Sequence, residues 1–337
     1  MVGCSVIVDL TDSKKSKGEF VETEISKEAN DFFWQQFHQG NYDSIGSIIS
    51  NLNLALAANP NDLVTTAHLG FVHVWALSER QRLTIPKADI TEHLLLSRRY
   101  FEEASKMNPH DPRLLGFYAD MTIAEGNVLG DESTVVDGYF KGLKSIKMWP
   151  QFNKFSIGYV FSILETTDKN FDKAIQWQYE TIEDCACEKV DRKSDYVSAI
   201  NKIKENKDPK IARACWNSWI APHNWEGFCL NFGDMLTKKG ELEEAEKIYN
   251  LAKLSDNYED WPFKEVLENR ILDIPQNALA FNQPLDEVNL KSQSVILFNS
   301  KHSCVSCHQM GKNDLLKYNE FKGLGKEFYF TKKGKFQ

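Results

Sequence analysis

Apolar, small and turn residues follow one another along the chain in an order that predicts helices joined in pairs. The clearest example runs from residue 224 to residue 254. Gly240 can adopt the left-handed conformation that ends many helices, so it separates two predicted helices. Gly233 in the first helix and Ala245 in the second are small enough for the helices to approach closely, and Tyr249 fills the space between them. This stretch therefore predicts an antiparallel helix hairpin.

Weaker copies of this pattern lie upstream. Prolines follow predicted helix ends at Pro60, Pro109 and Pro150, where they cannot continue a helix. Two-helix units of roughly 34 residues are typical of the tetratricopeptide repeat (TPR), which the chain resembles over about residues 28–182 and 222–256. The resemblance implies an all-α fold, a TPR-like α-solenoid of about five helix pairs.

Changes in composition divide the chain. Residues 1–27 form a polar N-terminal tether, and residues 28–272 form the repeat domain. Within that domain, residues 183–221 break the pattern with a charged run and an aromatic cluster, so we expect an irregular insertion there. Pro, Asn and Gln at residues 273–284 predict a linker, and residues 285–337 form a tail of a different character. We expect this tail to dock on the repeats, because it is too short to enclose a cofactor alone.

The repeats predict a binding role. Each helix pair contacts only its neighbours, and stacked pairs curve into a concave groove that commonly holds a peptide or a partner protein. A simple spacer is the alternative. No single groove residue stands out in the sequence.

The composition is that of a folded protein with an acidic surface. The 337 residues are 42% hydrophobic and 26% charged, with a net charge of −8. Nucleic-acid binding is not expected, because phosphate recognition needs a clustered basic surface. One basic cluster lies near the C-terminus and is either a solvated end or a docking patch for an acidic redox protein; it consists of Lys322, Lys326, Lys332, Lys333 and Lys335.

The tail contains the one strong chemical motif, a C-x-x-C-H run formed by Cys304, Cys307 and His308. Two thiols at this spacing can add to the two vinyl groups of haem, and the adjacent imidazole can then bind the iron. Leu297 and Phe298 precede the motif, and residues 290–310 resemble the first helix of c-type cytochromes. The resemblance implies one covalent haem c, with His308 as the proximal ligand.

The sixth iron ligand is not evident from the sequence. A small cytochrome c takes a Met from a loop well after the motif, but the only Met after His308 is Met310, which is too close to reach the opposite face. The ligand must come from the repeats or a partner, or the position is open to a small ligand or peroxide. His223 is our first candidate. The other candidates are His68, His73, His93 and Met235.

Other chemistry could use the same tail. Cys304 and Cys307 could form a plain disulfide or a thiol–disulfide redox pair. A soft metal such as copper(I) could bind His302, Cys304, Cys307, His308 and Met310. The chain has no G-x-x-x-x-G-K-[ST], H-E-x-x-H or G-x-G-x-x-G motif, so no nucleotide or zinc-protease site is expected.

Four further cysteines lie close together in the sequence: Cys185, Cys187, Cys215 and Cys229. In an oxidising compartment they would form two disulfides. A spacing of two points the side chains of Cys185 and Cys187 apart, so we expect each to pair with Cys215 or Cys229. Buried free thiols and a zinc site are the alternatives.

The N-terminus suggests a location. Small residues before Cys4, followed by a polar stretch, resemble the end of a bacterial lipoprotein signal, in which the cysteine becomes lipidated. The charged and apolar parts of such a signal are missing from this chain. The resemblance implies a cell-envelope protein, periplasmic or anchored at the outer membrane by lipid alone. Haem attachment and disulfides agree with that compartment.

These observations favour an extracytoplasmic monohaem c-type cytochrome with a TPR scaffold, which relays electrons to or from a protein partner. The alternative is a non-catalytic TPR adaptor lipoprotein whose C-x-x-C-H run is a disulfide or copper site. A peroxidase-type haem enzyme is a minor option, so an enzymatic role is less expected than electron transfer or binding.

Overall fold

A computed structural model describes the greater part of the chain, namely residues 23–83, 89–208, 211, 214–216, 224–285 and 293–316. All regular elements within these residues are α- or 3-10 helices, which confirms the expected all-α fold. Three predictions concern residues outside the described part: lipidation of Cys4, iron ligation by His223 and the basic cluster near the C-terminus. No described helix is both long enough and apolar enough to cross a membrane.

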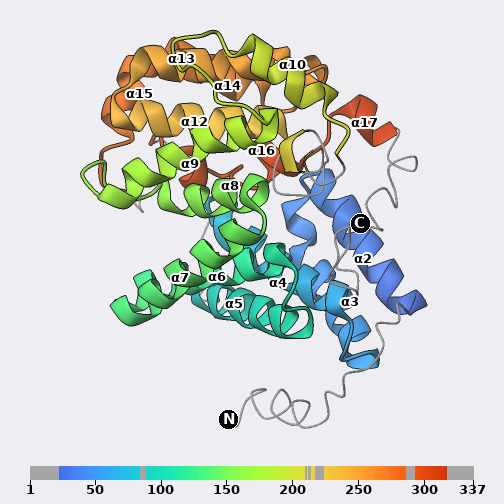
Figure 1. Ribbon diagram of the computed structural model, residues 1–337. Helices are drawn as coiled ribbons and strands as arrows, with labels where there is room; N and C mark the ends of the chain where they lie inside the picture. Colours follow the sequence, from blue (N-terminus) through green and yellow to red (C-terminus); the bar gives the residue numbers. More distant parts are fainter. Residues whose placement is uncertain are drawn as a thin grey trace.

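Consecutive helices pack against each other as hairpins, and each hairpin packs on the next (Figure 1). This arrangement is a solenoid-like stack, compatible with a TPR-like fold. The described residues form five such pairs: α2 (Glu24–His38) with α3 (Ile45–Ala58), α4 (Leu63–Ser78) with α5 (Ile90–Met107), α6 (Pro112–Leu129) with α7 (Glu132–Met148), α8 (Pro150–Phe161) with α9 (Lys169–Ala186), and α12 (Trp225–Lys239) with α13 (Leu242–Leu251).

Shorter helices complete the described residues. The stack is followed by η4 (Ala252–Leu254), η5 (Tyr258–Asp260), α14 (Lys264–Leu272) and α15 (Ile274–Ala280). The tail contains η6 (Leu297–Asn299), α16 (Val305–His308) and α17 (Lys312–Leu316). The turns and the insertion contain η2 (Tyr42–Ser44), η3 (Arg80–Arg82) and α10 (Val197–Glu205).

Local sequence explains where many helices begin. Asp62, Asp111 and Asp168 each precede a helix and accept a hydrogen bond from a backbone amide in its first turn. Such caps satisfy amides that have no partner within the helix, and each stabilises the helix by about 1 kcal/mol. Pro60 and Pro109 lie in the turns just before two of these caps, as the sequence predicted.

The last repeat has the predicted geometry. Gly240 ends α12 with a φ of 90°, in the left-handed region. A Cβ atom at Gly233 would lie 2.2 Å from the Tyr249 ring, so only glycine permits this approach of α12 and α13. The small residue and the ring that fills the space were both identified from the sequence.

The linker expected at residues 273–284 contains a helix instead. Pro275 occupies the first turn of α15, where a proline stabilises the helix start because no amide partner is lost there. α15 packs against α12 and α13, and Ile274 and Asn277 are buried. Proline, asparagine and glutamine therefore mark a short docked helix here. The expected insertion also differs in its start, because α9 runs on to Ala186 before the irregular chain begins.

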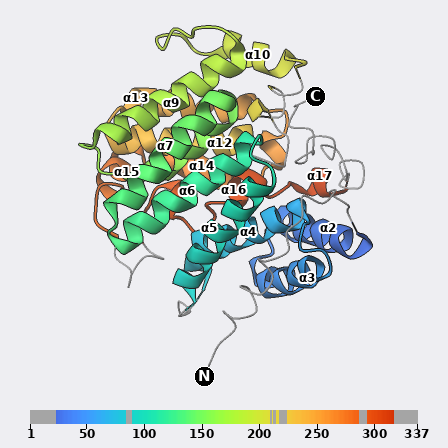
Figure 2. The ribbon, with the colours of Figure 1, turned by 60° about the horizontal axis from the view of Figure 1, so that its bottom comes forward.

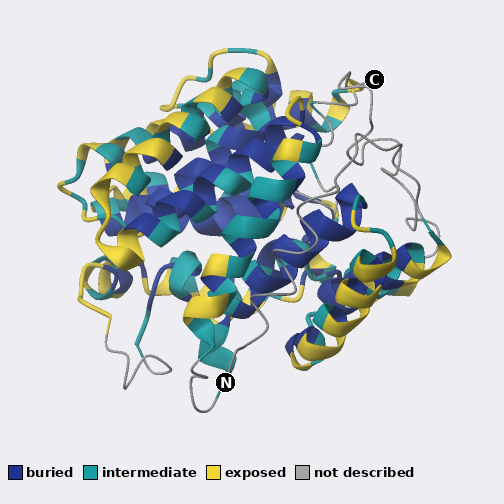
Figure 3. Ribbon diagram, turned by 90° about the horizontal axis from the view of Figure 1, so that it is seen from below, coloured by how far each residue is buried: buried dark blue, intermediate teal, exposed yellow. Residues whose placement is uncertain are grey.

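Much of the described part of the tail, residues 293–316, is buried in the protein interior. It passes between the N-terminal helices and the C-terminal helices (Figures 1 and 2). Leu297 belongs to the large apolar core of the C-terminal repeats, whereas Val305 belongs to the core formed by α2, α3 and α4. Buried residues cover the inward faces of the helices, and exposed residues follow the outer faces (Figure 3). One segment thus joins two separate cores.

Candidate functional site

Buried Glu79 holds the backbone of the C-x-x-C-H segment in place. Its Oε1 accepts hydrogen bonds from the amides of Cys304 and Val305, at 2.9 and 2.8 Å. Its Oε2 accepts one from Trp75 Nε1 and forms an ion pair with Arg82, both at 2.9 Å. Burial raises the pKa of Glu79, and Arg82 and the hydrogen-bond donors oppose that rise. The carboxylate therefore satisfies two amides at the start of α16.

Three other side chains bind backbone carbonyls of this segment. Tyr159 donates to Ser303 O at 3.0 Å, and Trp261 Nε1 donates to Ser306 O at 2.9 Å. His38 Nδ1 donates to His308 O at 2.8 Å. Burial lowers the pKa of His38 to about 4, so its imidazole is neutral at neutral pH and carries its proton on Nδ1. His38, Tyr159 and Trp261 therefore hold the backbone of the C-x-x-C-H segment by three hydrogen bonds.

Asp234 holds the residues that precede the motif. Its Oδ2 accepts from the Leu297 amide at 2.7 Å, and its Oδ1 accepts from the Tyr249 hydroxyl at 2.6 Å. Arg270 pairs with this carboxylate at 3.1 Å and donates to Val295 O at 2.5 Å. Leu297 and Phe298, the pair noted in the sequence, are thereby positioned beside Tyr159, whose ring centroid lies 5.0 Å from that of Phe298.

Cys304, Cys307 and His308 line one cavity of about 470 Å³. Its volume falls within the range of about 300–1,000 Å³ that is usual for small-molecule and cofactor sites. Most of the wall is apolar, and it comes from α2, α4, α5, α6, α8 and the tail; aromatic contributors include Phe37, Phe71, Phe117, Phe155 and Phe298. We call this space the tail cavity.

Some residues that line the tail cavity are exposed to solvent. Among its lining residues, Val128 and Leu285 are exposed large apolar side chains, and Ile163 is exposed as well. Arg80, Thr91 and Asn127 add polar groups to the lining. Asp120 is a buried carboxyl on the wall, and burial raises its pKa to about 7, against the effect of a 2.5 Å hydrogen bond from Ser156. The cavity therefore combines an apolar interior with a few polar groups.

Both motif cysteines are free thiols. Burial raises the pKa of Cys307 to about 12 and also raises that of Cys304, so both are protonated at neutral pH. A Cβ atom at Gly227 would lie 2.3 Å from Cys307 Sγ, so a glycine in α12 makes room for this sulfur. The His308 ring stacks on Phe37, with 4.8 Å between centroids. Two thiols and an imidazole thus share one wall of the cavity.

None of the described residues that we considered as a sixth ligand lines this cavity. His68 Nδ1 lies 2.7 Å from Asn30 Oδ1. His73 and His93 hydrogen bond to each other at 2.7 Å. Met235 is buried in α12 and accepts from Asn231 at 3.6 Å. His223 lies outside the described residues. His68, His73, His93 and Met235 therefore do not line the cavity, whose walls come from segments far apart in the chain.

Sequence reasoning also missed two residues at the site. Glu79 directly follows α4 and binds the motif backbone, and Met121 in α6 lines the cavity, but no sequence signal marks either residue. The glutamate beside Arg80 and Arg82 resembled ordinary surface charge. Only its position against the tail shows its role.

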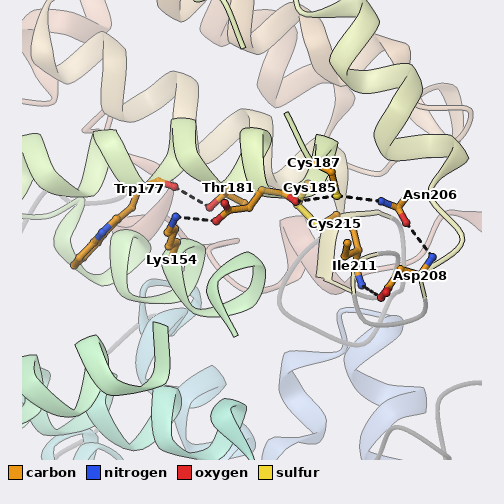
Figure 4. Close-up of a disulfide and its surroundings, with 10 residues drawn as sticks. Lys154, Trp177, Thr181, Cys185, Cys187, Asn206, Asp208, Ile211 and Cys215 are labelled. Carbon is orange, nitrogen blue, oxygen red and sulfur yellow. Dashed lines mark hydrogen bonds and ion pairs between the residues drawn. A yellow bond between two sulfur atoms is a disulfide. The ribbon is translucent and has the colours of Figure 1, made fainter. Parts of the chain in front are cut away.

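The other cysteines form one disulfide (Figure 4). Cys185 at the end of α9 is bonded to Cys215. Cys187 is an exposed free thiol, and Cys229 is a buried free thiol in α12. The structure therefore differs from the expected two disulfides, because Cys187 lies outside the core whereas Cys229 is enclosed within it. No group of three or more His, Cys, Asp or Glu within the described ranges is arranged to hold a metal ion.

Comparisons with known proteins give no further assignment. No protein-family model, no curated protein and no solved structure matches the chain.

Proposed function

We propose that this protein is a monohaem c-type cytochrome that carries its haem in the tail cavity. One observation carries the proposal: Cys304, Cys307 and His308 line the same wall of a largely apolar cavity of cofactor size. A C-x-x-C-H run on an exposed strand or loop would not support it. The cavity supplies what a covalently held porphyrin needs, namely two thiols, an imidazole and apolar walls.

The residues fit the attachment chemistry. Addition of each S–H across a vinyl C=C bond forms a carbon–sulfur bond and transfers the hydrogen to the neighbouring carbon, so no oxidant and no leaving group is needed. The sulfurs must be thiols for this addition, and both are. Gly227 leaves room for Cys307 Sγ, and Cys307 lines the cavity.

The chain's own side chains would set the properties of the site. Bound haem would supply a one-electron redox couple. His308 would provide the proximal nitrogen, and stacking on Phe37 restrains its ring. Glu79 fixes the backbone at Cys304 and Val305, which limits reorganisation when an electron arrives or leaves. The apolar walls exclude water, and the exposed lining residues Val128 and Leu285 give a redox partner access to the cavity.

The location and partner belong to the same proposal. The Cys185–Cys215 disulfide supports an oxidising compartment. Lipidation of Cys4, an envelope location and a protein partner in the repeat groove are supported by sequence resemblance. The adaptor lipoprotein with a disulfide or copper site is the competing proposal. A peroxidase-type enzyme would need an open iron face and an acid–base group, and Asp120 on the cavity wall favours it.

A spectrum and a mass test the haem directly. The full chain, produced in a host that matures c-type cytochromes, should give a pyridine haemochrome spectrum and an intact mass greater by one haem. Cys304→Ala with Cys307→Ala should abolish covalent attachment. The matched control is Cys187→Ala, which removes an exposed free thiol and should leave the spectrum unchanged. Colourless protein with both tail thiols open to alkylation would refute the proposal.

A further inference from the structure

α6 forms part of the wall of the tail cavity, and so does the C-x-x-C-H motif. α16 packs against α2 and α12, whereas α6 packs against α5, α7 and α8, so these two elements reach the cavity from different neighbours. Four α6 residues that line the cavity recur at helical spacing: Phe117, Met121, Ala124 and Val128. Residues three or four apart share one helix face, so this face of α6 is turned to the cavity.

Few atoms on the cavity wall can bind haem iron. The useful protein donors are imidazole nitrogen, thioether sulfur, thiolate sulfur and phenolate oxygen. Among the described lining residues, Cys304 and Cys307 would be consumed by thioether formation, and His308 supplies the proximal nitrogen. Tyr159 already donates its hydroxyl hydrogen to Ser303 O. The remaining donor is the sulfur of Met121.

The segment around Met121 is firmly held. The neighbouring Asp120 accepts a hydrogen bond from Ser156 at 2.5 Å, which ties α6 to α8. Ala119 and Ile123 are buried in the main core. A methionine side chain is unbranched and flexible, so it can adjust to a ligand from a fixed backbone position. α6 thus offers a soft sulfur on a rigid support.

We propose that Met121 Sδ would be the sixth ligand of the haem iron, with His308 as the proximal ligand. The inference rests on the proposed cytochrome function and deepens it. Methionine from a repeat helix would replace the ligand that a small cytochrome c takes from the chain after its motif. A His/Met pair raises the reduction potential and closes the iron to small ligands, which favours electron transfer over peroxidase chemistry.

The first test needs no variant. The oxidised wild-type protein should show the weak near-infrared charge-transfer band of a sulfur–iron(III) bond, and its reduced form should not bind carbon monoxide. Haem attached without this band would overturn ligation by Met121 and leave the cytochrome proposal standing. Absence of covalent haem would refute the cytochrome proposal itself, so the two failures are distinguishable.

Variants then identify the residue. Met121→Leu should keep covalent haem but lose the sulfur band, turn high-spin and gain carbon monoxide binding. Met121→His should restore a low-spin spectrum without the band and with a lower reduction potential. Met235→Leu is the matched control, because Met235 is buried in α12 and does not line the cavity. If Met121→Leu or Met121→His retains the wild-type band, or Met235→Leu loses it, the assignment is wrong.

Discussion

Two buried carboxylates hold the tail, one from each half of the molecule, and they act on different parts of it. Asp234 binds the Leu297 amide before the motif, and Glu79 binds the amides of Cys304 and Val305 within it. Each also pairs with an arginine. The Arg270 side chain beside Asp234 is 13% exposed, whereas the Arg82 side chain beside Glu79 is 27% exposed.

The different exposure of the two arginines predicts different roles for the two carboxylates, one in stability and the other in the geometry of the site. An ion pair that is more deeply buried leaves a costlier unpaired charge when one partner is removed. Asp234 should therefore matter more for the free energy of unfolding. Glu79 contacts the backbone of a cavity-lining cysteine, so it should matter more for the environment of the proposed haem.

The largest expected loss of stability follows Asp234→Ala. The change leaves Arg270, the Tyr249 hydroxyl and the Leu297 amide without their shared acceptor. Breaking a buried pair from one side costs about 3–5 kcal/mol. Urea unfolding of the wild type and variant measures this loss. A loss under about 1 kcal/mol, the value of an exposed pair, would contradict the role assigned to this carboxylate.

Glu79→Ala should cost less stability but disturb the site more. We expect a loss of about 3 kcal/mol, at the lower end of the same range, because Arg82 reaches solvent. We also expect a broadened or shifted haem spectrum, because the Cys304 amide loses its acceptor. Glu79→Gln keeps the acceptor oxygen and should restore most of the spectrum. If Asp234→Ala disturbs the spectrum more than Glu79→Ala, the division between the two carboxylates is wrong.

Acid should weaken the N-terminal half first, because the histidines are unevenly distributed. From residue 111 to residue 301 the only histidine is His223, whereas α2 and α4 contain buried His38, His68 and His73. Burial lowers the pKa of His68 from 6.5 to about 3. The unfolded chain therefore binds this proton more readily, and stability is lost as the pH falls below the unfolded pKa of about 6.5.

The expected slope reaches roughly 1.4 kcal/mol per pH unit for this one group at pH values well below its unfolded pKa and above its folded pKa. Unfolding free energies at several pH values, for the wild type and for His68→Gln, measure it. The variant should show a shallower loss towards acid. Equal slopes would show that His68 does not contribute to the pH dependence.

Much of the repeat architecture could be predicted from the sequence. The hairpin of α12 and α13 depends on neighbours in the chain, and Gly233, Gly240 and Tyr249 have the roles that their spacing predicts. The docked helix α15 was missed because its proline and amide residues are equally typical of linkers. The contacts of α15 with α12 and α13, which come from the tertiary structure, stabilise the helix in this segment.

Only the candidate residues that are neighbours in the sequence could be predicted. Cys304, Cys307 and His308 are adjacent in the sequence, and their spacing alone indicates their chemistry. Glu79 and Met121 were not predictable, because nothing near them in the sequence distinguishes them from a surface glutamate and a core methionine.

The sequence by itself determined the helix pairs, their turns and the C-x-x-C-H run, since each depends on residues within a few turns of one another. The tertiary structure decided which side chains surround that run. Glu79 accepts a hydrogen bond from the amide of Cys304, which lies 225 residues further along the chain. The cavity walls come from five helices and the tail. Contacts over such separations depend on how the hairpins stack and where the tail enters between them, and short-range patterns do not encode either.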